Sequence, residues 1–123
     1  RRMGLTVEKN FFSDLNQVLD DVKGNKTWPT TFVSGPSEGL PEHWHDYDVH
    51  AYVMEGETWF LDGETGERKE VEAGDKVVIP GKALHAEGEV EEKVVYIVAI
   101  PQPVMNRDFL TMRTIESEKD PLD

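Results

Sequence analysis

The feature that most constrains the fold is a succession of short β-rich segments separated by turn residues, between positions 28 and 100. Dipeptides such as Asp62-Gly63 and Pro80-Gly81 favour tight turns between the apolar runs. Seven strands are predicted, at Thr30–Ser34, Asp48–Glu55, Thr58–Asp62, Glu67–Val71, Lys76–Ile79, His85–Glu87 and Val94–Ile100. Because no helical segments alternate with them, we expect an all-β, antiparallel sandwich or barrel.

One short helix is expected before the strands, at about residues 13–23. Its apolar stripe is formed by Leu15, Val18, Leu19 and Val22. Ser13 or Asp14 can cap its start, and Gly24 followed by Asn25 can end it. An apolar stripe needs a partner surface, so we expect the helix to pack on the outside of the sheet.

The 123 residues are expected to form a single domain, 1–123, with a β core at about 28–101 and a C-terminal arm at 102–123. A chain of this length buries roughly two thirds of its unfolded surface. No internal repeat and no linker divides it. In the arm, Phe109, Met112 and Ile115 are expected to form a last strand or to pack on a second subunit.

The charge balance excludes several classes of partner. Lys and Arg number 13 and Asp and Glu number 25, which gives a net charge of −12. Such a surface repels phosphate backbones and anionic lipid, so we expect binding neither to nucleic acid nor to a membrane. The chain has no cysteine, which excludes disulfides and thiolate chemistry. We expect a soluble protein, and the compartment stays open between the cytoplasm and secretion after loss of a leader.

Histidine is the residue type on which the expected chemistry depends. His43, His45 and His50 lie within eight residues, and His85 follows the turn at Pro80-Gly81. On a strand, residues i and i+2 project from the same face, so His43 and His45 can direct both imidazoles at one cation. A third ligand from elsewhere in the chain would fix the geometry.

Two segments, in this order, resemble the two sequence motifs of the cupin superfamily. They are His43-x-His45 followed by Tyr52-Val-Met-Glu-Gly-Glu57, and then Gly74-Asp-x4-Pro80-x4-His85. The resemblance covers residues 41–85. It implies an antiparallel jelly-roll barrel, commonly a homodimer, with a divalent metal inside that His43, His45 and His85 would hold.

The sequence departs from the cupin pattern where the first motif usually carries a glutamate. One way of counting places His50 at this position and the other places Val49 there, and these two side chains point to opposite faces of a strand. A bulge at 46–48 would bring His50 inward, as a fourth metal ligand or as a hydrogen-bond donor beside the ligands. Without the bulge, His50 lies outside a three-histidine site. Lys82 stands where the second motif has glycine, which predicts a rearranged turn.

An all-imidazole ligand set leaves the ion its full charge and suits Cu, Fe, Mn, Ni or Zn. We therefore expect a metal-dependent oxidoreductase, dioxygenase-like or oxidase-like, that acts on a small or cyclic oxygenated substrate. A variant is copper-dependent oxidation of a carbohydrate. The alternatives are a non-catalytic cupin that binds a small molecule or sugar with a structural metal, and a non-redox isomerase or lyase.

Other side chains are candidates around this site. Trp44 and Tyr47 either pack the barrel or form an aromatic rim that stacks on a cyclic substrate. The catalytic candidates, for a reaction that needs a base, are Tyr47, Tyr52, Glu55 and Glu57. Asp46 and Asp48 could orient a ligand imidazole or lie in a solvated loop, and Arg107 and Arg113 could reach a substrate carboxylate. A homodimer is expected, through the N-terminal segment or an edge strand.

Overall fold

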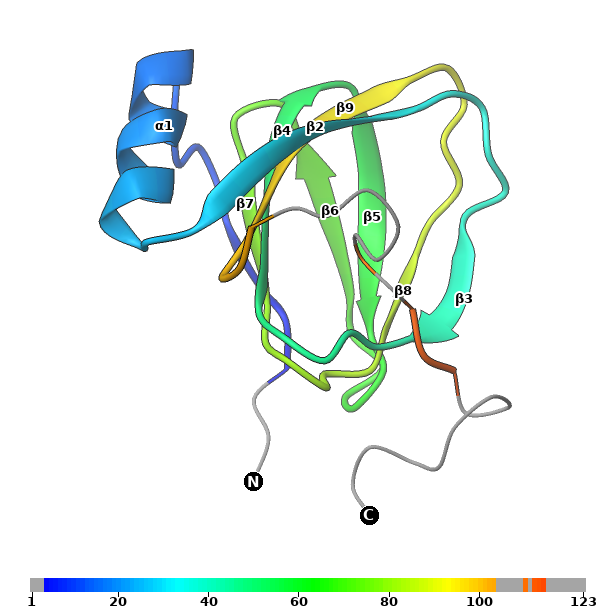
Figure 1. Cartoon of the computed structure of the whole chain (residues 1–123). Helices are drawn as coiled ribbons and strands as arrows, with labels where there is room; N and C mark the ends of the chain where they lie inside the picture. The colour runs from blue at the N-terminus through cyan, green and yellow to red at the C-terminus, as the bar shows by residue number, and fades with distance from the viewer. Residues whose placement is uncertain (1–3, 104–109, 111, 115–123) are drawn as a thin grey trace.

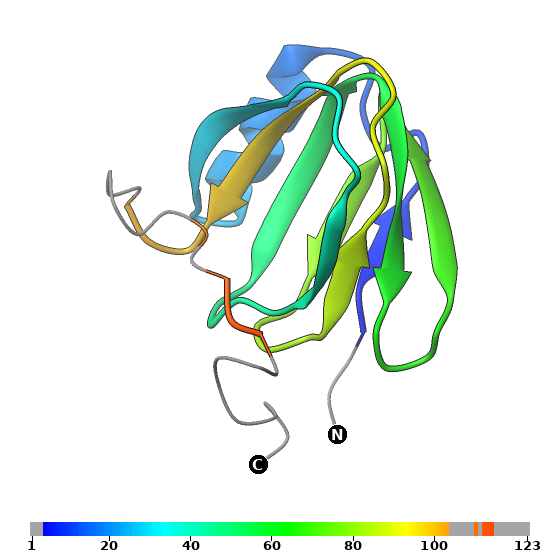
Figure 2. The ribbon, with the colours of Figure 1, turned by 90° about the vertical axis from the view of Figure 1, so that its right-hand side faces the viewer.

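Two antiparallel sheets face each other and enclose the core of the molecule (Figures 1 and 2). The computed structural model describes residues 4–103, 110 and 112–114. The five-stranded sheet has the order β1 (Thr6–Glu8), β7 (Lys76–Ile79), β4 (Val49–Glu55), β9 (Val94–Ile100) and β2 (Trp28–Ser34). The four-stranded sheet has the order β3 (Leu40–His43), β8 (His85–Glu87), β5 (Glu57–Asp62) and β6 (Arg68–Glu72).

All seven predicted strands are present, with ends that differ from the prediction by two residues or fewer. Strands β1 and β3 were not predicted. The all-β antiparallel architecture with one N-terminal helix is confirmed. In the expected C-terminal arm, Phe109 and Ile115 lie outside the described residues.

The strand periodicity of two decides which side chains enter the core. On β4, Val49, Ala51 and Val53 point between the sheets and pack in the main hydrophobic cluster. Their neighbours His50 and Tyr52 point to the outer face of the five-stranded sheet, and Tyr52 belongs to a second cluster beneath the helix.

The helix α1 (Leu15–Gly24) lies against the outer face of the five-stranded sheet, as expected (Figure 1). Asp14 caps it, since its side chain accepts from the N–H of Gln17 and the Gln17 side chain accepts from the N–H of Asp14. Val18 and Val22 are buried in the second cluster, whereas the other half of the predicted stripe, Leu15 and Leu19, is exposed.

One carboxylate fastens the helix to the sheet. Asp21 of α1 accepts a hydrogen bond from the hydroxyl of Tyr52 and another from the ammonium of Lys76, both at 2.6 Å. Although partial burial alone would raise the pKa of Asp21, these two hydrogen bonds outweigh it and lower that pKa.

No helix in the part of the chain that the structure describes has both the length and the apolar character needed to cross a membrane.

Candidate metal centre

Three histidines meet between the two sheets: one from β3, one from the segment that follows β3, and one from β8. His43 ends β3 and His85 begins β8, and the two residues are direct partners in the antiparallel pairing. His45 follows His43 at a spacing of two, and all three side chains are buried. The ring centroids are 4.3 Å apart for His43 and His85, and 5.2 and 5.4 Å from His45 to His43 and His85. One ring nitrogen of each lies within 4.8 Å of the others, so the cluster could hold a metal ion.

Backbone carbonyls fix the orientation of two of the rings. His43 Nδ1 lies 2.8 Å from the carbonyl oxygen of Pro41, and His85 Nδ1 lies 2.9 Å from that of Ala83. Because a carbonyl only accepts, both Nδ1 atoms carry the proton and both Nε2 atoms carry a lone pair. This is the second interaction that a metal-binding imidazole usually makes.

The Nε2 atoms of His43 and His85 are buried and have no hydrogen-bond partner among the described residues. A buried polar atom left in this state costs about 1–3 kcal/mol. A divalent metal would satisfy both lone pairs at once, so the residues present fit such an ion.

Electrostatics keep these imidazoles neutral. Burial, reinforced by the proximity of His43, lowers the pKa of His85 to about 3. Burial also lowers the pKa of His43. Because a protonated imidazole cannot bind a metal, the cluster is ready to bind one at neutral pH without losing protons.

The histidines lie at the wall of a cavity of about 310 Å³ between the two sheets. Most of its lining is apolar and includes Phe32, Phe60, Tyr96 and Val98, with Leu110 and Met112 from the C-terminal arm. A cavity with apolar walls and a few convergent polar groups is the usual form of a small-molecule site. Met112 thus lines the cavity of its own chain.

One carboxylate, that of Glu87, also lines this cavity. Its Oε2 lies 3.9 Å from Nε2 of His43, and its side chain is 28% exposed. Burial raises the pKa of Glu87 to about 7. The sequence analysis missed this residue, although a signal was present: Glu87 follows His85 at the same i, i+2 spacing that relates His43 to His45.

His50 does not join the cluster. It lies on the outer face of β4, where burial and the nearby ammonium of Lys76 lower its pKa. The pairing of β4 with β7 is regular from Val49 to Tyr52, so the strand keeps its period of two through His50. The bulge expected at 46–48 would have been needed to turn His50 inward, and the irregularity of β4 lies instead between Val53 and Glu55. The structure thus brings together three histidines, not four.

Trp44 and Tyr47 are not in the lining of the cavity. Trp44 is buried, and its backbone N–H and carbonyl pair with those of Arg113 at 2.9 Å. Tyr47 packs against the main hydrophobic cluster, and its hydroxyl accepts a hydrogen bond from the N–H of Leu110. The structure therefore places both in the packing of the barrel, whereas Phe32 and Tyr96 supply the aromatic surface of the cavity.

The remaining candidates also lie away from the histidine rings. Tyr52 donates to Asp21 beneath the helix, and Glu55 pairs with Lys93 at 2.9 Å. Both carboxylate oxygens of Asp46 accept from Arg113, and Asp48 accepts from the N–H of Gly81. Arg107 lies outside the described residues.

The glycine position of the second motif keeps a left-handed backbone. Lys82 has a φ of 67°, a conformation that costs a residue with a Cβ about 1–2 kcal/mol. Its N–H donates to the carbonyl of His45 at 2.7 Å, so this turn supports the segment that carries the second histidine.

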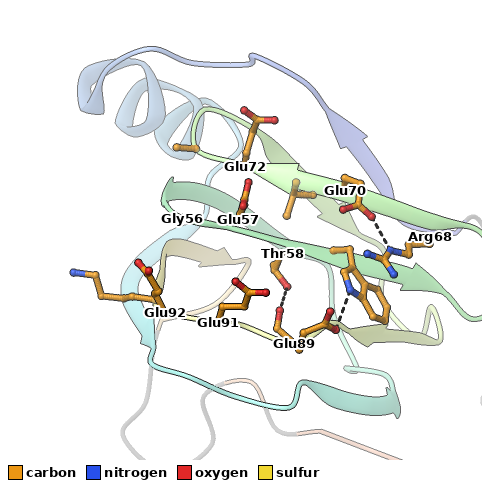
Figure 3. A pocket seen from close by; sticks show the side chains of 13 residues that line it. Gly56, Glu57, Thr58, Arg68, Glu70, Glu72, Glu89, Glu91 and Glu92 are labelled. Carbon is orange, nitrogen blue, oxygen red and sulfur yellow. Dashed lines mark hydrogen bonds and ion pairs between the residues drawn. The ribbon is translucent and has the colours of Figure 1, made fainter.

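Glu57 lies in a different concavity, an acidic groove of about 810 Å³ between β5, β6 and the segment 89–93 (Figure 3). Six exposed glutamates line this acidic groove: Glu57, Glu70, Glu72, Glu89, Glu91 and Glu92. Arg68 pairs with Glu70, and the indole N–H of Trp59 donates to Glu89 (Figure 3). Among the described residues the acidic groove contains no buried polar atom without a partner, so it has the character of a solvated charged surface.

No protein-family model matches the sequence, and no curated protein is significantly similar to it. Solved structures do match. A DMSP lyase, DddQ, from Ruegeria pomeroyi aligns with a TM-score of 0.59 and 17% identity, over 76% of this chain and 45% of its own. The polyketide cyclase RemF from Streptomyces resistomycificus aligns with a TM-score of 0.55 and 22% identity, over 95% of this chain and 75% of its own.

A third solved structure is an uncharacterized Klebsiella pneumoniae protein with a double-stranded β-helix domain. It aligns with a TM-score of 0.52 and 15% identity, over 73% of this chain and 76% of its own. At these identities the likeness concerns the fold alone. The chain has the double-stranded β-helix, or jelly-roll, fold of cupins.

Proposed function

We propose that this protein is a metal-dependent cupin oxidoreductase that acts on a small molecule with an apolar body and an anionic or chelating oxygen group. The observation that carries the proposal is the pair of buried Nε2 atoms, on His43 and His85, that have no partner among the described residues at the wall of an apolar cavity. His45 would complete a three-nitrogen ligand set.

The ligand set bears on the class of reaction. A divalent transition metal held by neutral imidazoles would act as a Lewis acid toward a substrate oxygen, and a redox-active one would also exchange electrons with dioxygen. Cu, Fe, Mn, Ni and Zn all suit such ligands. The carbonyls of Pro41 and Ala83 hold the rings of His43 and His85 in the orientation that binding requires.

The cavity walls bear on the class of substrate. Phe32, Phe60 and Tyr96 offer aromatic surface to an apolar or planar body. Sugar hydroxyls would find few hydrogen-bond partners on these walls, and burying them unpaired is costly. We therefore favour an apolar or aromatic oxygenated compound over the carbohydrate considered from the sequence.

The C-terminal arm contributes to the closure of the site. Arg113 pairs with Asp46 and forms an antiparallel bridge with Trp44, which anchors the arm beside β3 (Figure 2). Leu110 and Met112, on either side of residue 111, then lie in the cavity lining. This contact adds two apolar side chains to the cavity wall.

A second candidate is a non-redox reaction, such as isomerisation or elimination, in the same cavity. One observation favours it: the carboxylate of Glu87 lines the cavity near His43 and is the right chemical type for moving a proton. Tyr52, Glu55 and Glu57, the bases considered from the sequence, lie elsewhere.

The test begins with protein stripped of metal and reloaded separately with Fe²⁺, Cu²⁺, Mn²⁺ and Zn²⁺. Oxygen uptake is then followed with a panel of phenols, diketones and aromatic carboxylic acids. We expect uptake with a redox metal, lost in His45→Ala, and none with Zn²⁺. Turnover of the panel with Zn²⁺ and without oxygen would support the second candidate instead.

We also propose that the protein forms a homodimer. Strand β2 is an edge of the five-stranded sheet, and its side chains Trp28 and Val33 are exposed. Exposed edges of this kind favour pairing with another chain. Sedimentation at tens of micromolar should give the mass of a dimer, and a monomer there would contradict this part of the proposal.

A further inference from the structure

We propose that Glu87 is the carboxylate ligand of the metal, supplied by β8 in place of the glutamate that the first motif lacks. This inference rests on the proposed function, because it assigns a role at the same site. The segment after His45 has two carboxylates, and both have partners elsewhere: Asp46 accepts from Arg113 and Asp48 accepts from the N–H of Gly81.

The local structure directs Glu87 to the histidines. Glu87 and His85 are the two ends of the three-residue strand β8 and project from one face, into the cavity. Across the pairing, His85 lies opposite His43 and Glu87 lies opposite Leu40, another residue of the cavity lining. The register that joins the two histidines therefore also places this carboxylate beside them.

The distance is compatible with a shared ion after a small movement. Glu87 Oε2 is 3.9 Å from His43 Nε2. Two ligand atoms at about 2.1 Å from one tetrahedral ion are about 3.4 Å apart. Glu87 does not belong to the group of His43, His45 and His85, whose ligand atoms lie within 4.8 Å of one another, so its side chain must rotate toward His85 and His45. Glutamate has three rotatable bonds for this movement, and the cavity provides the space.

The partly buried carboxylate of Glu87 has fewer hydrogen-bond partners than the buried carboxylates of Asp75 and Asp62. Asp75 is buried and accepts from the N–H groups of Asn10 and Glu72 and from Lys9. Asp62 is buried and accepts from the N–H groups of residues 64 and 65. Glu87 accepts no hydrogen bond from any described residue, and its one ion-pair contact is His43.

A carboxylate between apolar walls without donors is unfavourable unless a cation compensates it. A divalent ion on the Nε2 atoms of His43 and His85 would be that cation. A site with three imidazoles and one carboxylate favours Fe²⁺ or Mn²⁺ more than a purely nitrogen site does.

The test compares Glu87→Gln with the wild type and with Glu91→Gln. Glu91 is an exposed residue of the acidic groove, so its substitution removes the same charge far from the ligands. Dissociation constants for Co²⁺, Mn²⁺ and Zn²⁺ are measured by competition with a chelator, and the visible absorption of bound Co²⁺ reports its ligands.

We expect Glu87→Gln to weaken binding by about 10-fold or more, to change the Co²⁺ spectrum, and to leave the metal-free protein folded. Glu91→Gln should bind as the wild type does. Wild-type affinity and spectrum in Glu87→Gln, with binding still abolished by His45→Ala, would overturn this inference and leave the three-histidine site in place. Equal weakening in both glutamine variants would also overturn it, because only overall charge would then matter. Absence of metal binding in the wild type would overturn the proposed function itself.

Discussion

Replacing His85 by leucine should separate the stability of the barrel from that of the metal site. The side chain of His85 is fully buried, its Nδ1 donates to the carbonyl of Ala83, and its Nε2 has no partner among the described residues. Leucine is apolar and of similar size. It removes a nitrogen whose unpaired burial costs about 1–3 kcal/mol, and it gives up a hydrogen bond worth about 0.5–1.5 kcal/mol.

These two contributions oppose each other, so the free energy of unfolding of the metal-free protein should change by between a loss of about 0.5 and a gain of about 2.5 kcal/mol. His85→Ala provides the contrast, because it leaves a cavity and should destabilise the metal-free protein by about 2–4 kcal/mol. The two variants have the same loss of the imidazole and differ in the packing that replaces it.

The metal-bound protein should behave differently. At a free metal concentration of 100 times the dissociation constant, binding stabilises the folded state by about 2.7 kcal/mol. For a domain of this size, that corresponds to a rise in melting temperature of about 10 °C. Because His85 supplies one of three proposed ligands, most of this rise should be absent in His85→Leu.

The assay is a thermal melt of each protein with excess chelator and with Zn²⁺ or Co²⁺, combined with urea unfolding of the metal-free forms. An equal rise in melting temperature for the wild type and His85→Leu at the same free metal concentration would refute the ligand role. A loss of more than about 3 kcal/mol of unfolding free energy in metal-free His85→Leu would show that Nε2 of His85 has a partner. That result would refute the argument that the unpaired Nε2 atoms fit a metal ion.

Three further results are expected. Hydrogen bonds outweigh burial and lower the pKa of Asp75. Its contribution to the free energy of unfolding is therefore complete above about pH 4 and is lost as the pH falls through the pKa that Asp75 has in the folded protein. The urea midpoint of Asp75→Asn should fall less in acid than that of the wild type. Gly56→Ala should cost at least about 2 kcal/mol in urea unfolding, because φ is 88° and the new Cβ would lie 2.1 Å from a backbone oxygen. Gly66→Ala has a φ of 78° but open space around the new Cβ, so it should cost only the backbone strain. Arg113→Ala breaks a half-exposed pair with Asp46, so stability should change by less than about 1 kcal/mol while a chelator strips the metal faster.

The strands could be predicted from the sequence because their signals are local. Turn residues bound each segment, and β4 and β9 are rich in apolar residues that are buried or half-buried. Strand β3 has no such signal: it contains Pro41 and Glu42, and three of its four residues are exposed. Its pairing with β8 is long-range, so local propensity could not indicate it. Strand β1 has three residues and depends in the same way on the edge of β7.

The same difference between local signals and long-range pairing decides which site residues could be predicted. The spacing of His43 and His45 is a local signal, and in the structure their imidazoles lie together with that of His85. Whether His50 would join them depended on the position of a bulge, which is a property of the strand pairing and not of the residues near His50. Glu87 was missed because the spacing rule was applied to histidines alone, although it relates Glu87 to His85 equally well.

The position of the bulge explains how a strand as polar as β3 contributes to an apolar cavity. Leu40 and His43 are three residues apart, whereas their partners on β8, Glu87 and His85, are two apart. Strand β3 therefore carries one extra residue, and this cancels the change of face that a separation of three would otherwise produce. Leu40 and His43 both line the cavity for this reason. The bulge on β3 turns His43 inward, whereas the bulge considered at 46–48, which would have turned His50 inward, is not found, and His50 stays on the outer face of the regular strand β4.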